Sequence, residues 1–334
     1  MPKENAPSTP TISNWLSAHY NIKAVSLARL SLGADIYAST YKVQTDDQKT
    51  YFLKLKHKNH HDISMDIIEL LQHADLQQII CPIKTIHGKT SQSTGDFNLI
   101  VYPFIQGEDG FHRPLTDDQW KILGKALKKV HEVSVPFSIQ NRLRKETYSP
   151  RWREAVRSIY AHFETLPIAD EIAQELYKLM KEKKLEIHQL LNRAEELSQT
   201  VQHLSPPLVL CHSDIHAGNV LIDEEHVIYI VDWDEPMMAP KERDLMFIGG
   251  GVGNVWNRPH EEKQFYEGYG KTEINSKILS YYRHERIVED IAIYSQELLL
   301  TAAGGENRST MYQHFVDMFA PQGVIEIAFK TGKA

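Results

Sequence analysis

The first hundred residues carry short apolar segments, separated by polar turns, in the pattern that is typical of β-strands. The segments are rich in β-branched, aromatic and aliphatic residues, and turns such as Thr45–Gln48 divide them. We expect five strands, at Ala24–Ser31, Ala38–Gln44, Thr50–Lys56, Ile80–Ile86 and Phe97–Tyr102. The pattern therefore predicts a five-stranded, mostly antiparallel sheet.

Helical spacing interrupts this sheet and then dominates the chain after Gly107. Apolar residues on one helical face predict an inserted helix over Ile63–His73, and a short helix is expected at Trp15–Tyr20. After Gly107, Thr116 and Gln119 have the spacing of a capping box, which satisfies free amides at a helix start. Further helices are expected from Ser149, over Ile168–His203 and through most of Leu245–Lys330.

Three short apolar runs lie inside this helical part and predict short strands. They are Leu208–Cys211, Val220–Ile222 and Val227–Val231. The change from strands to helices predicts an α+β chain of two lobes. We expect an N-terminal lobe at 1–101, a connection at 102–107 and a larger, mainly helical lobe at 108–334.

Charge divides at nearly the same place. The chain has 37 Lys and Arg against 44 Asp and Glu, a net charge of −7, which disfavours non-specific binding to nucleic acid. Residues 1–105 hold ten basic and nine acidic residues, so the remainder carries −8. An acidic second lobe favours a cationic small molecule as partner.

The chain ends and the cysteines indicate a cytoplasmic protein. No apolar stretch follows Met1, so we expect no signal peptide, and no apolar window is long enough to span a membrane. Cys81 and Cys211 lie 130 positions apart and are expected to be free thiols.

Polar residues of chemical interest follow two of the short apolar runs. His212, Asp214 and Asn219 come directly after the first run, and Asp232 comes after a later run, thirteen positions beyond Asn219. Loops at strand ends hold side chains rigidly at an exposed edge, which suits catalysis.

This spacing, followed by Asp232-Trp233-Asp234, resembles the aminoglycoside phosphotransferase and choline kinase family, relatives of protein kinases. The resemblance covers most of the chain and implies a two-lobed protein-kinase-like fold that uses ATP and Mg²⁺. Four further segments resemble the nucleotide-covering loop, the lysine strand, the connection between lobes and a late Asp-Leu pair: Leu32–Asp35, Tyr51–Lys54, Val101–Gly107 and Asp244–Leu245.

The resemblance implies a role for each polar residue, and the chemistry agrees. Asp214 is expected to be the base that receives the proton of the acceptor hydroxyl. Asn219 and Asp232 offer oxygen ligands of the kind that Mg²⁺ prefers. Other residues are expected at the nucleotide: Lys54, Gly33, Asp35, Pro103, Ile105 and Asp66.

The implied reaction is transfer of the γ-phosphate of ATP to a hydroxyl of an aminocyclitol or aminoglycoside antibiotic, with spectinomycin as the expected acceptor and resistance as the result. Asp234, Glu235 and Trp256 are candidates to contact that acceptor. Trp256 could equally be a core residue. Endogenous acceptors such as choline, homoserine, thioribose or a fructosamine-like metabolite remain as alternatives.

Several assignments stay open at this level. Lys56 shares a strand face with Lys54 and is a rival for the phosphates. The carboxylate expected to pair with the lysine has no clear match, since alignment places Ser64 there; the candidates are Asp62, Asp66 and Glu69. A metallohydrolase built on His212, Asp214 and His216, a protein kinase and a non-catalytic nucleotide-binding module are the competing classes.

Overall fold

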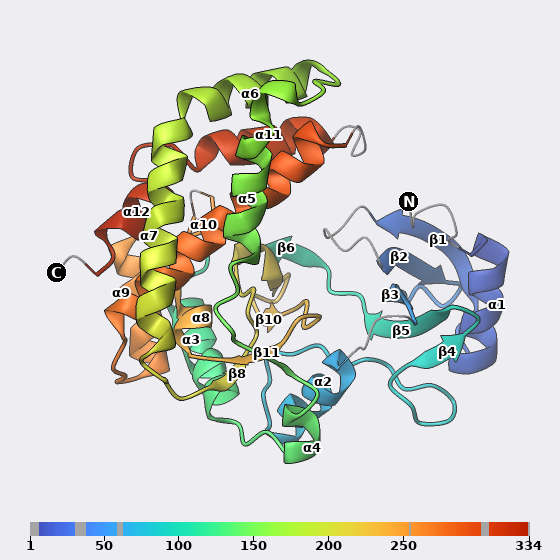
Figure 1. The fold of residues 1–334 in the computed structure, drawn as a ribbon. Coiled ribbons are helices and arrows are strands. Elements are labelled where there is room, and N and C mark those ends of the chain that lie inside the picture. The colour runs from blue at the N-terminus through green and yellow to red at the C-terminus, as the bar shows by residue number, and fades with distance from the viewer. Residues whose placement is uncertain (1–6, 31–37, 59–62, 254, 302–306, 333–334) are drawn as a thin grey trace. The chain divides into compact units, whose positions relative to one another are not determined.

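The computed structural model describes residues 7–30, 38–58, 63–253, 255–301 and 307–332 (Figure 1). Contacts divide the chain into two compact units. The first comprises Met1–Arg113, Ser134–Arg142 and Asn219–Pro236, and the second comprises Pro114–Val133, Leu143–Gly218 and Met237–Ala334. The connection expected at 102–107 stays a prediction.

An antiparallel five-stranded sheet forms the centre of the first unit, in the order β1-β2-β3-β5-β4. Its strands are β1 (Ala24–Leu30), β2 (Ala38–Thr45), β3 (Thr50–His57), β4 (Gln92–Thr94) and β5 (Phe97–Pro103). Side chains alternate between the faces of a strand, so Leu53 and Leu55 enter the core while Lys54 and Lys56 point to the other face. The sheet thus confirms the expected class of the N-terminal part.

Helix α1 (Thr9–Tyr20) packs Ile12 and Leu16 into the same core. It begins earlier than the expected Trp15, because Ser8 caps it by accepting a hydrogen bond from the amide of Thr11. The inserted helix is α2 (Ser64–His73), as expected. A short helix, α4 (Phe137–Gln140), also belongs to the first unit.

The strand expected at Ile80–Ile86 is wrong. Pro82 stands in the middle of that apolar run and has no amide hydrogen to donate to a neighbouring strand. A single bridge between Ile79 and Ile230 attaches this segment, together with bonds from the amide of Ile83 to Val101 O, at 2.7 Å, and from the amide of Ile86 to His19 O, at 2.9 Å. The fifth strand is β4, whose residues Gln92–Thr94 are too polar to stand out in the sequence.

A second sheet of the first unit joins distant segments in the order β10-β9-β6. Its strands are β6 (Gly107–Asp109), β9 (Val220–Asp223) and β10 (Ile228–Ile230). The β9–β10 hairpin confirms two of the expected short strands, and Asp223 stabilises its turn by accepting from the amides of Glu225 and Val227. β6 was not expected.

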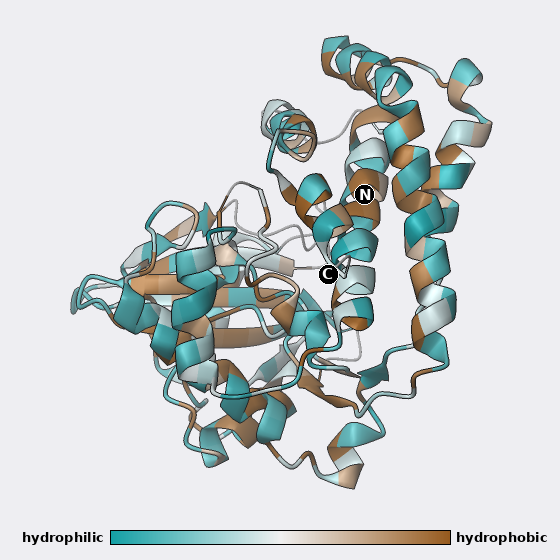
Figure 2. Ribbon diagram, turned by 90° about the vertical axis from the view of Figure 1, so that its left-hand side faces the viewer, coloured by the Kyte–Doolittle hydropathy of each residue, from teal (hydrophilic) through white to brown (hydrophobic). Residues whose placement is uncertain are grey.

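The second unit is mainly helical, and α10 (Ser276–Leu299) lies at its centre. Figure 1 shows α5, α6, α7, α11 and α12 around this helix. Their bounds are α5 (Arg151–Ala161), α6 (Glu171–Glu182), α7 (Lys184–Gln202), α11 (Asn307–Asp317) and α12 (Val324–Lys330). The helices carry both apolar and polar residues in Figure 2, as expected of helices that bury one face.

The single long helix expected over Ile168–His203 is wrong, because the segment forms two helices. The chain leaves the helix at Lys183, within the charged run Lys181–Lys184. That run contains neither glycine nor proline, and both helices bury apolar residues at helical spacing in one core. Periodicity alone therefore could not detect the break.

Helix α3 (Asp117–Glu132) begins with the expected capping box, in which Thr116 and Gln119 bond each other's backbone amides. It crosses α9 (Pro259–Tyr269) at close range. A Cβ on Gly124 would lie 2.2 Å from Phe265 O, and one on Gly268 would lie 2.0 Å from Lys121 O. The two glycines therefore allow the two backbones to approach each other.

A small sheet completes the second unit and leads into the loop of interest. It has the order β7-β11-β8, with β7 (Arg144–Lys145), β11 (Met237–Ala239) and β8 (Val209–Cys211), and α8 (Glu242–Leu245) follows β11. Both Cys81 and Cys211 are free, as expected. Within the described residues, no helix is both long and apolar enough to cross a membrane.

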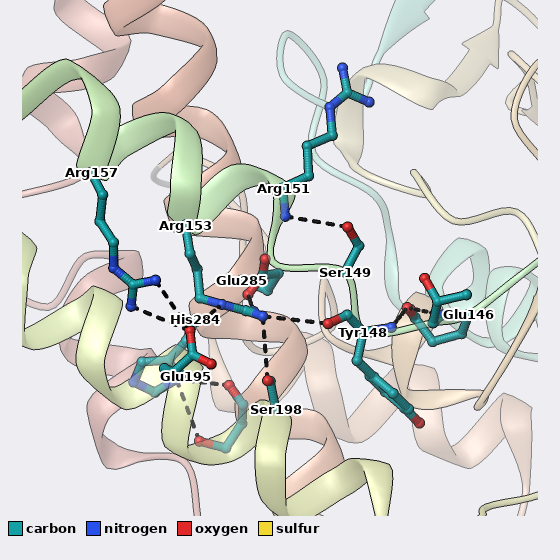
Figure 3. Close-up of polar contacts among 12 residues, drawn as sticks. Glu146, Tyr148, Ser149, Arg151, Arg153, Arg157, Glu195, Ser198, His284 and Glu285 are labelled. Atoms are coloured by element: carbon teal, nitrogen blue, oxygen red, sulfur yellow. Dashed lines mark hydrogen bonds and ion pairs between the residues drawn. The ribbon is translucent and has the colours of Figure 1, made fainter.

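Arg153 ties α5, α7 and α10 together inside the second unit (Figure 3). Its side chain is 1% exposed and pairs with Glu285 and with Glu195, whose Oε2 lies 3.1 Å from Nε. It also donates to Ser198 Oγ at 3.3 Å. Burial raises the pKa of Glu285 to about 7 although Arg153 opposes the shift. Burial therefore disfavours the charged form of Glu285, and Arg153 partly offsets that cost.

We expect Arg153→Met to lower the free energy of unfolding by about 3–5 kcal/mol, because Glu285 loses the partner that compensates its buried charge. Arg157→Met is the matched control, since Arg157 pairs with the same Glu195 from a side chain that is 43% exposed. Its loss should be about 0.2–1 kcal/mol. Urea unfolding of both variants measures the difference, and equal losses would contradict the assignment.

Candidate active site

In the first unit, two lysines on β3 share one aspartate. Lys54 and Lys56 have side chains that are 12% and 10% exposed, and both pair with Asp234, at 2.7 Å for Lys56 Nζ. Lys54 Nζ also lies 3.2 Å from Asp232 Oδ1. Both lysines therefore belong to one charged cluster, and both have the position expected of the lysine that contacts the phosphates.

The charges in this cluster stabilise one another. Burial by itself would raise the pKa of Asp234, but Lys54 and Lys56 outweigh it and lower that pKa to about 2. Burial opposes the charge on Lys54 as well, yet Asp234 and Asp232 raise its pKa above the ordinary value. Asp234 and Lys54 are therefore both ionised at neutral pH.

Asn219 and Asp232 lie at the same end of the β9–β10 hairpin. Asn219 precedes β9 and Asp232 follows β10 by two positions, and the amide of Val231 donates to Asn219 O at 3.0 Å. Asp232 has a φ of 62°, in the left-handed region that aspartate tolerates better than most residues, and its side chain is exposed. An amide and a carboxylate in this arrangement are suitable donors for a hard divalent cation.

Helix α2 supplies no carboxylate to Lys54 among the described residues. Asp66 pairs with Arg142 at 3.0 Å, Ser64 Oγ accepts from Lys56 Nζ at 3.3 Å, and Glu69 is exposed. Asp62 lies outside the described residues. Lys54 instead pairs with Asp232 and Asp234, so the expected role of Asp66 beside Lys54 has no support in these contacts.

The remaining nucleotide candidates are only partly described. Gly33 and Asp35 lie outside the described residues. Pro103 ends β5, opposite Tyr51 of β3, and Ile105 is half-buried two positions later. Backbone groups just beyond a strand end are suitably placed for a ligand to bond, and their assignment to the adenine stays a prediction.

In the second unit, a buried carboxylate holds the loop that carries Asp214. The two oxygens of Asp244 accept from the amides of Ser213, at 2.7 Å, and His212, at 2.9 Å. His131 Nε2 lies 3.0 Å from the same carboxylate, and Tyr269 bonds the other ring nitrogen at 2.7 Å. Ser213 has a φ of 73°, so these bonds stabilise a backbone conformation that serine rarely adopts.

Asp214 follows this braced segment and pairs with two side chains. Arg286 of α10 donates to Oδ1, and His216 Nε2 lies 3.5 Å from Oδ2. Burial alone would raise the pKa of Asp214, but Arg286 and His216 hold it well below its usual range. The low pKa keeps this carboxylate ionised. Because its side chain is 39% exposed, a ligand can also reach it.

The two neighbouring histidines bond the loop itself. His212 Nδ1 accepts from the amide of Asp214 at 3.3 Å, and His216 Nδ1 accepts from the amide of Gly218 at 3.0 Å. Since Nδ1 of the neutral ring is then the acceptor, Nε2 of His216 carries the proton that faces Asp214. This geometry uses the histidines as loop braces and lends no support to the metallohydrolase alternative.

Among the described residues, His131, Cys211 and Asp244 form the one group of three or more His, Cys, Asp or Glu side chains whose spacing could hold a metal ion. Burial raises the pKa of the Cys211 thiol well above its usual value, and the thiol lies 3.6 Å from the carbonyls of Ala239 and Pro240. Asp244 is already bonded to two amides. A protonated thiol and an engaged carboxylate make this a structural cluster rather than a metal site.

The expected acceptor contacts are only partly supported. Trp256 is 3% exposed, and its ring meets that of Trp120 edge-on at 5.0 Å, which favours the core alternative. Asp234 pairs with the two lysines, and Glu235 is exposed. Sequence reasoning missed His131, Arg286 and Asp290. Arg286 and Asp290 are four positions apart on α10, a spacing that is common on exposed helices, so spacing alone could not identify them.

Comparisons with known proteins agree on one family. The model of the phosphotransferase enzyme family matches residues 30–276. The chain is similar to spectinomycin phosphotransferase APH(9)-Ia in complex with ADP and spectinomycin, with 47% identity, a TM-score of 0.92 and coverage of 99% of this chain and 100% of that one. The AMP-bound complex gives 46% identity, a TM-score of 0.88 and coverage of 98% and 100%. An amicoumacin kinase shares the fold at 17% identity and a TM-score of 0.64, over 97% and 98% of the chains.

We expect Asp244→Asn to release the Asp214 loop, because an asparagine has one oxygen for two buried amide donors. The free energy of unfolding should fall by about 1–3 kcal/mol, and the amide of Ser213 should exchange its hydrogen faster. Asp223→Asn, in the exposed β9–β10 turn, is the control and should leave that amide unchanged. Equal exchange at Ser213 in wild type and Asp244→Asn would show that the carboxylate does not hold the loop.

Proposed function

The chain belongs to the phosphotransferase enzyme family, as its motifs indicated, and we propose that it transfers the γ-phosphate of ATP to a hydroxyl of spectinomycin. The observation that carries the proposal is the 47% identity, over 99% of this chain, to an enzyme solved with ADP and spectinomycin. Such a transfer modifies the antibiotic and so confers resistance. The need for ATP and the free thiols Cys81 and Cys211 support a cytoplasmic location.

Lys54 and two residues at one end of the β9–β10 hairpin are the groups proposed to bind the nucleotide and its metal ion. Lys54 is charged, and its partners are carboxylates that nucleotide phosphates can replace. Asn219 and Asp232 would hold Mg²⁺, since both offer oxygen atoms at one end of the hairpin. When bound, the ion neutralises charge on the phosphates.

Asp214 is the proposed base, and its low pKa makes it a weak one. A carboxylate that Arg286 keeps ionised is ready to accept a hydrogen bond from the acceptor hydroxyl, but it is too weak to remove the proton early. Phosphoryl transfer through a loose transition state needs little early proton removal. Asp214 would therefore orient the hydroxyl first and receive its proton late.

A cationic acceptor suits the charge of the chain. Residues beyond 105 carry a net −8, and a negative field raises the encounter rate of a cationic amine. Glu235 remains a proposed contact because it is exposed, whereas Asp234 is engaged with the lysines and Trp256 is buried.

Purified protein with ATP and Mg²⁺ should phosphorylate spectinomycin, as measured by ADP release and by the mass of the product. Asp214→Ala should keep nucleotide affinity and lose at least about 100-fold in kcat, because a positioned base contributes that much or more. Choline, homoserine, thioribose and a fructosamine are the comparison acceptors. Turnover of one of these without any turnover of spectinomycin would overturn the proposed substrate.

We expect Asp232→Ala to remove the Mg²⁺ dependence of nucleotide binding, because it deletes the carboxylate proposed to hold the ion. Asp234→Ala is the matched control: it also removes a partner of Lys54 but leaves the proposed ligands in place. Calorimetric titration of ADP at several Mg²⁺ concentrations measures both. The metal assignment is refuted if Asp232→Ala keeps the wild-type Mg²⁺ dependence of nucleotide binding.

A further inference from the structure

Arg286 of α10 bonds two carboxylates, that of the proposed base Asp214 and that of Asp290, which lies one turn further along the same helix. Its Nη1 donates to Asp214 Oδ1, and its Nε donates to Asp290 Oδ1 at 3.1 Å. The guanidinium also lies over the ring of Phe247, 5.4 Å from its centroid. Three neighbours therefore fix a planar group whose donors have a rigid geometry.

The helix that carries Arg286 is itself held in place. Asn275 caps its first turn, and Glu285, the preceding residue, pairs with the buried Arg153 (Figure 3). Successive residues on a helix point about 100° apart. Glu285 and Arg286 therefore lie on adjacent faces of α10, and the first pairs with Arg153 while the second bonds Asp214. The position of Arg286 is thus set by the core of the second unit.

We propose that Arg286, anchored by Asp290, is a positioning residue that fixes the carboxylate of Asp214 in the orientation needed to receive the acceptor hydroxyl. The proposal deepens the proposed function and rests on it, because it presumes that Asp214 is the base. The hydrogen bond from Arg286 to Oδ1, together with His216 Nε2 at 3.5 Å from Oδ2, restricts rotation of the carboxylate. A carboxylate held in one plane presents the same oxygen to every acceptor that binds.

The surroundings indicate more than an ordinary surface ion pair. The side chains of Arg286 and Asp290 are each about one-fifth exposed, and burial together with Glu289 raises the pKa of Asp290 to about 6 in spite of Arg286. Three carboxylates, Asp214, Glu289 and Asp290, thus lie in the field of this guanidinium. Without Arg286, Asp214 would lose the hydrogen bond at Oδ1 that holds its carboxylate in place.

Arg286→Met should lower kcat by about 100-fold, the loss expected when a reacting group shifts by about 1 Å, with KM for ATP and for the acceptor within about threefold of wild type. Arg286→Lys keeps the positive charge but loses the planar guanidinium. Its kcat should lie between those of wild type and Arg286→Met. Asp290→Asn should lower kcat less than Arg286→Met, because it removes only the anchor.

Arg283→Met is the matched control for general damage to α10. Arg283 stands three positions earlier and bonds Met246 O, Ile248 O and Thr331 Oγ1, and none of these bonds involves Asp214. It should lower Tm and keep kcat within about twofold, as expected for a change remote from the reacting groups. A loss of kcat in Arg286→Met no larger than in Arg283→Met would overturn the proposal.

A crystal structure of Arg286→Met separates this proposal from the proposed function. We expect the Asp214 carboxylate to have moved or rotated relative to wild type, and an unchanged carboxylate would overturn the proposal whatever the substrate is. A displaced carboxylate in an enzyme that turns over no acceptor would support the positioning and refute the function. If Arg286→Met does not fold, the same structure and kinetics of Arg286→Lys give the decision.

Discussion

The two bonds from the amides of His212 and Ser213 to Asp244 are the interaction on which the loop that carries Asp214 depends. They lie in the core of the second unit, where an unsatisfied amide or carboxylate would be costly. They hold Ser213 in the left-handed region and so fix the direction in which the chain leaves β8. Asp214 then lies where Arg286 donates a hydrogen bond to it, so the position of the proposed base is a consequence of the core packing.

The charged side chains of the candidate site lie beside side chains of opposite sign. Asp232 and Asp234 accompany Lys54, and Arg286 accompanies Asp214. Nucleotide phosphates carry the sign of the carboxylates, and a divalent cation or a cationic acceptor carries the sign of the basic groups. Binding can therefore exchange partners without leaving a buried charge alone, which keeps the cost of desolvation low.

The sequence predicted the elements whose signals are local, and it failed where tertiary contacts decide. Runs of β-branched, aromatic and aliphatic residues identified β2, β3 and the β9–β10 hairpin, and the capping box identified the start of α3. The strand at Ile80–Ile86 and the single helix at Ile168–His203 were predicted wrongly, because apolar residues continue on both sides of Pro82 and Lys183. Spacing around Asp214 and Asp232 identified the candidate residues, whereas Arg286 lies 72 positions from Asp214, and only the fold brings the two together.

The most direct test of the account is a crystal structure with Mg²⁺, a non-hydrolysable ATP analogue and spectinomycin. The account predicts the metal on Asn219 and Asp232, Lys54 bonded to the phosphates, and one acceptor hydroxyl within hydrogen-bonding distance of Asp214, about 2.6–3.2 Å. A hydroxyl bonded to another side chain, with Asp214 still facing only protein groups, would contradict the central claim that Asp214 is the base.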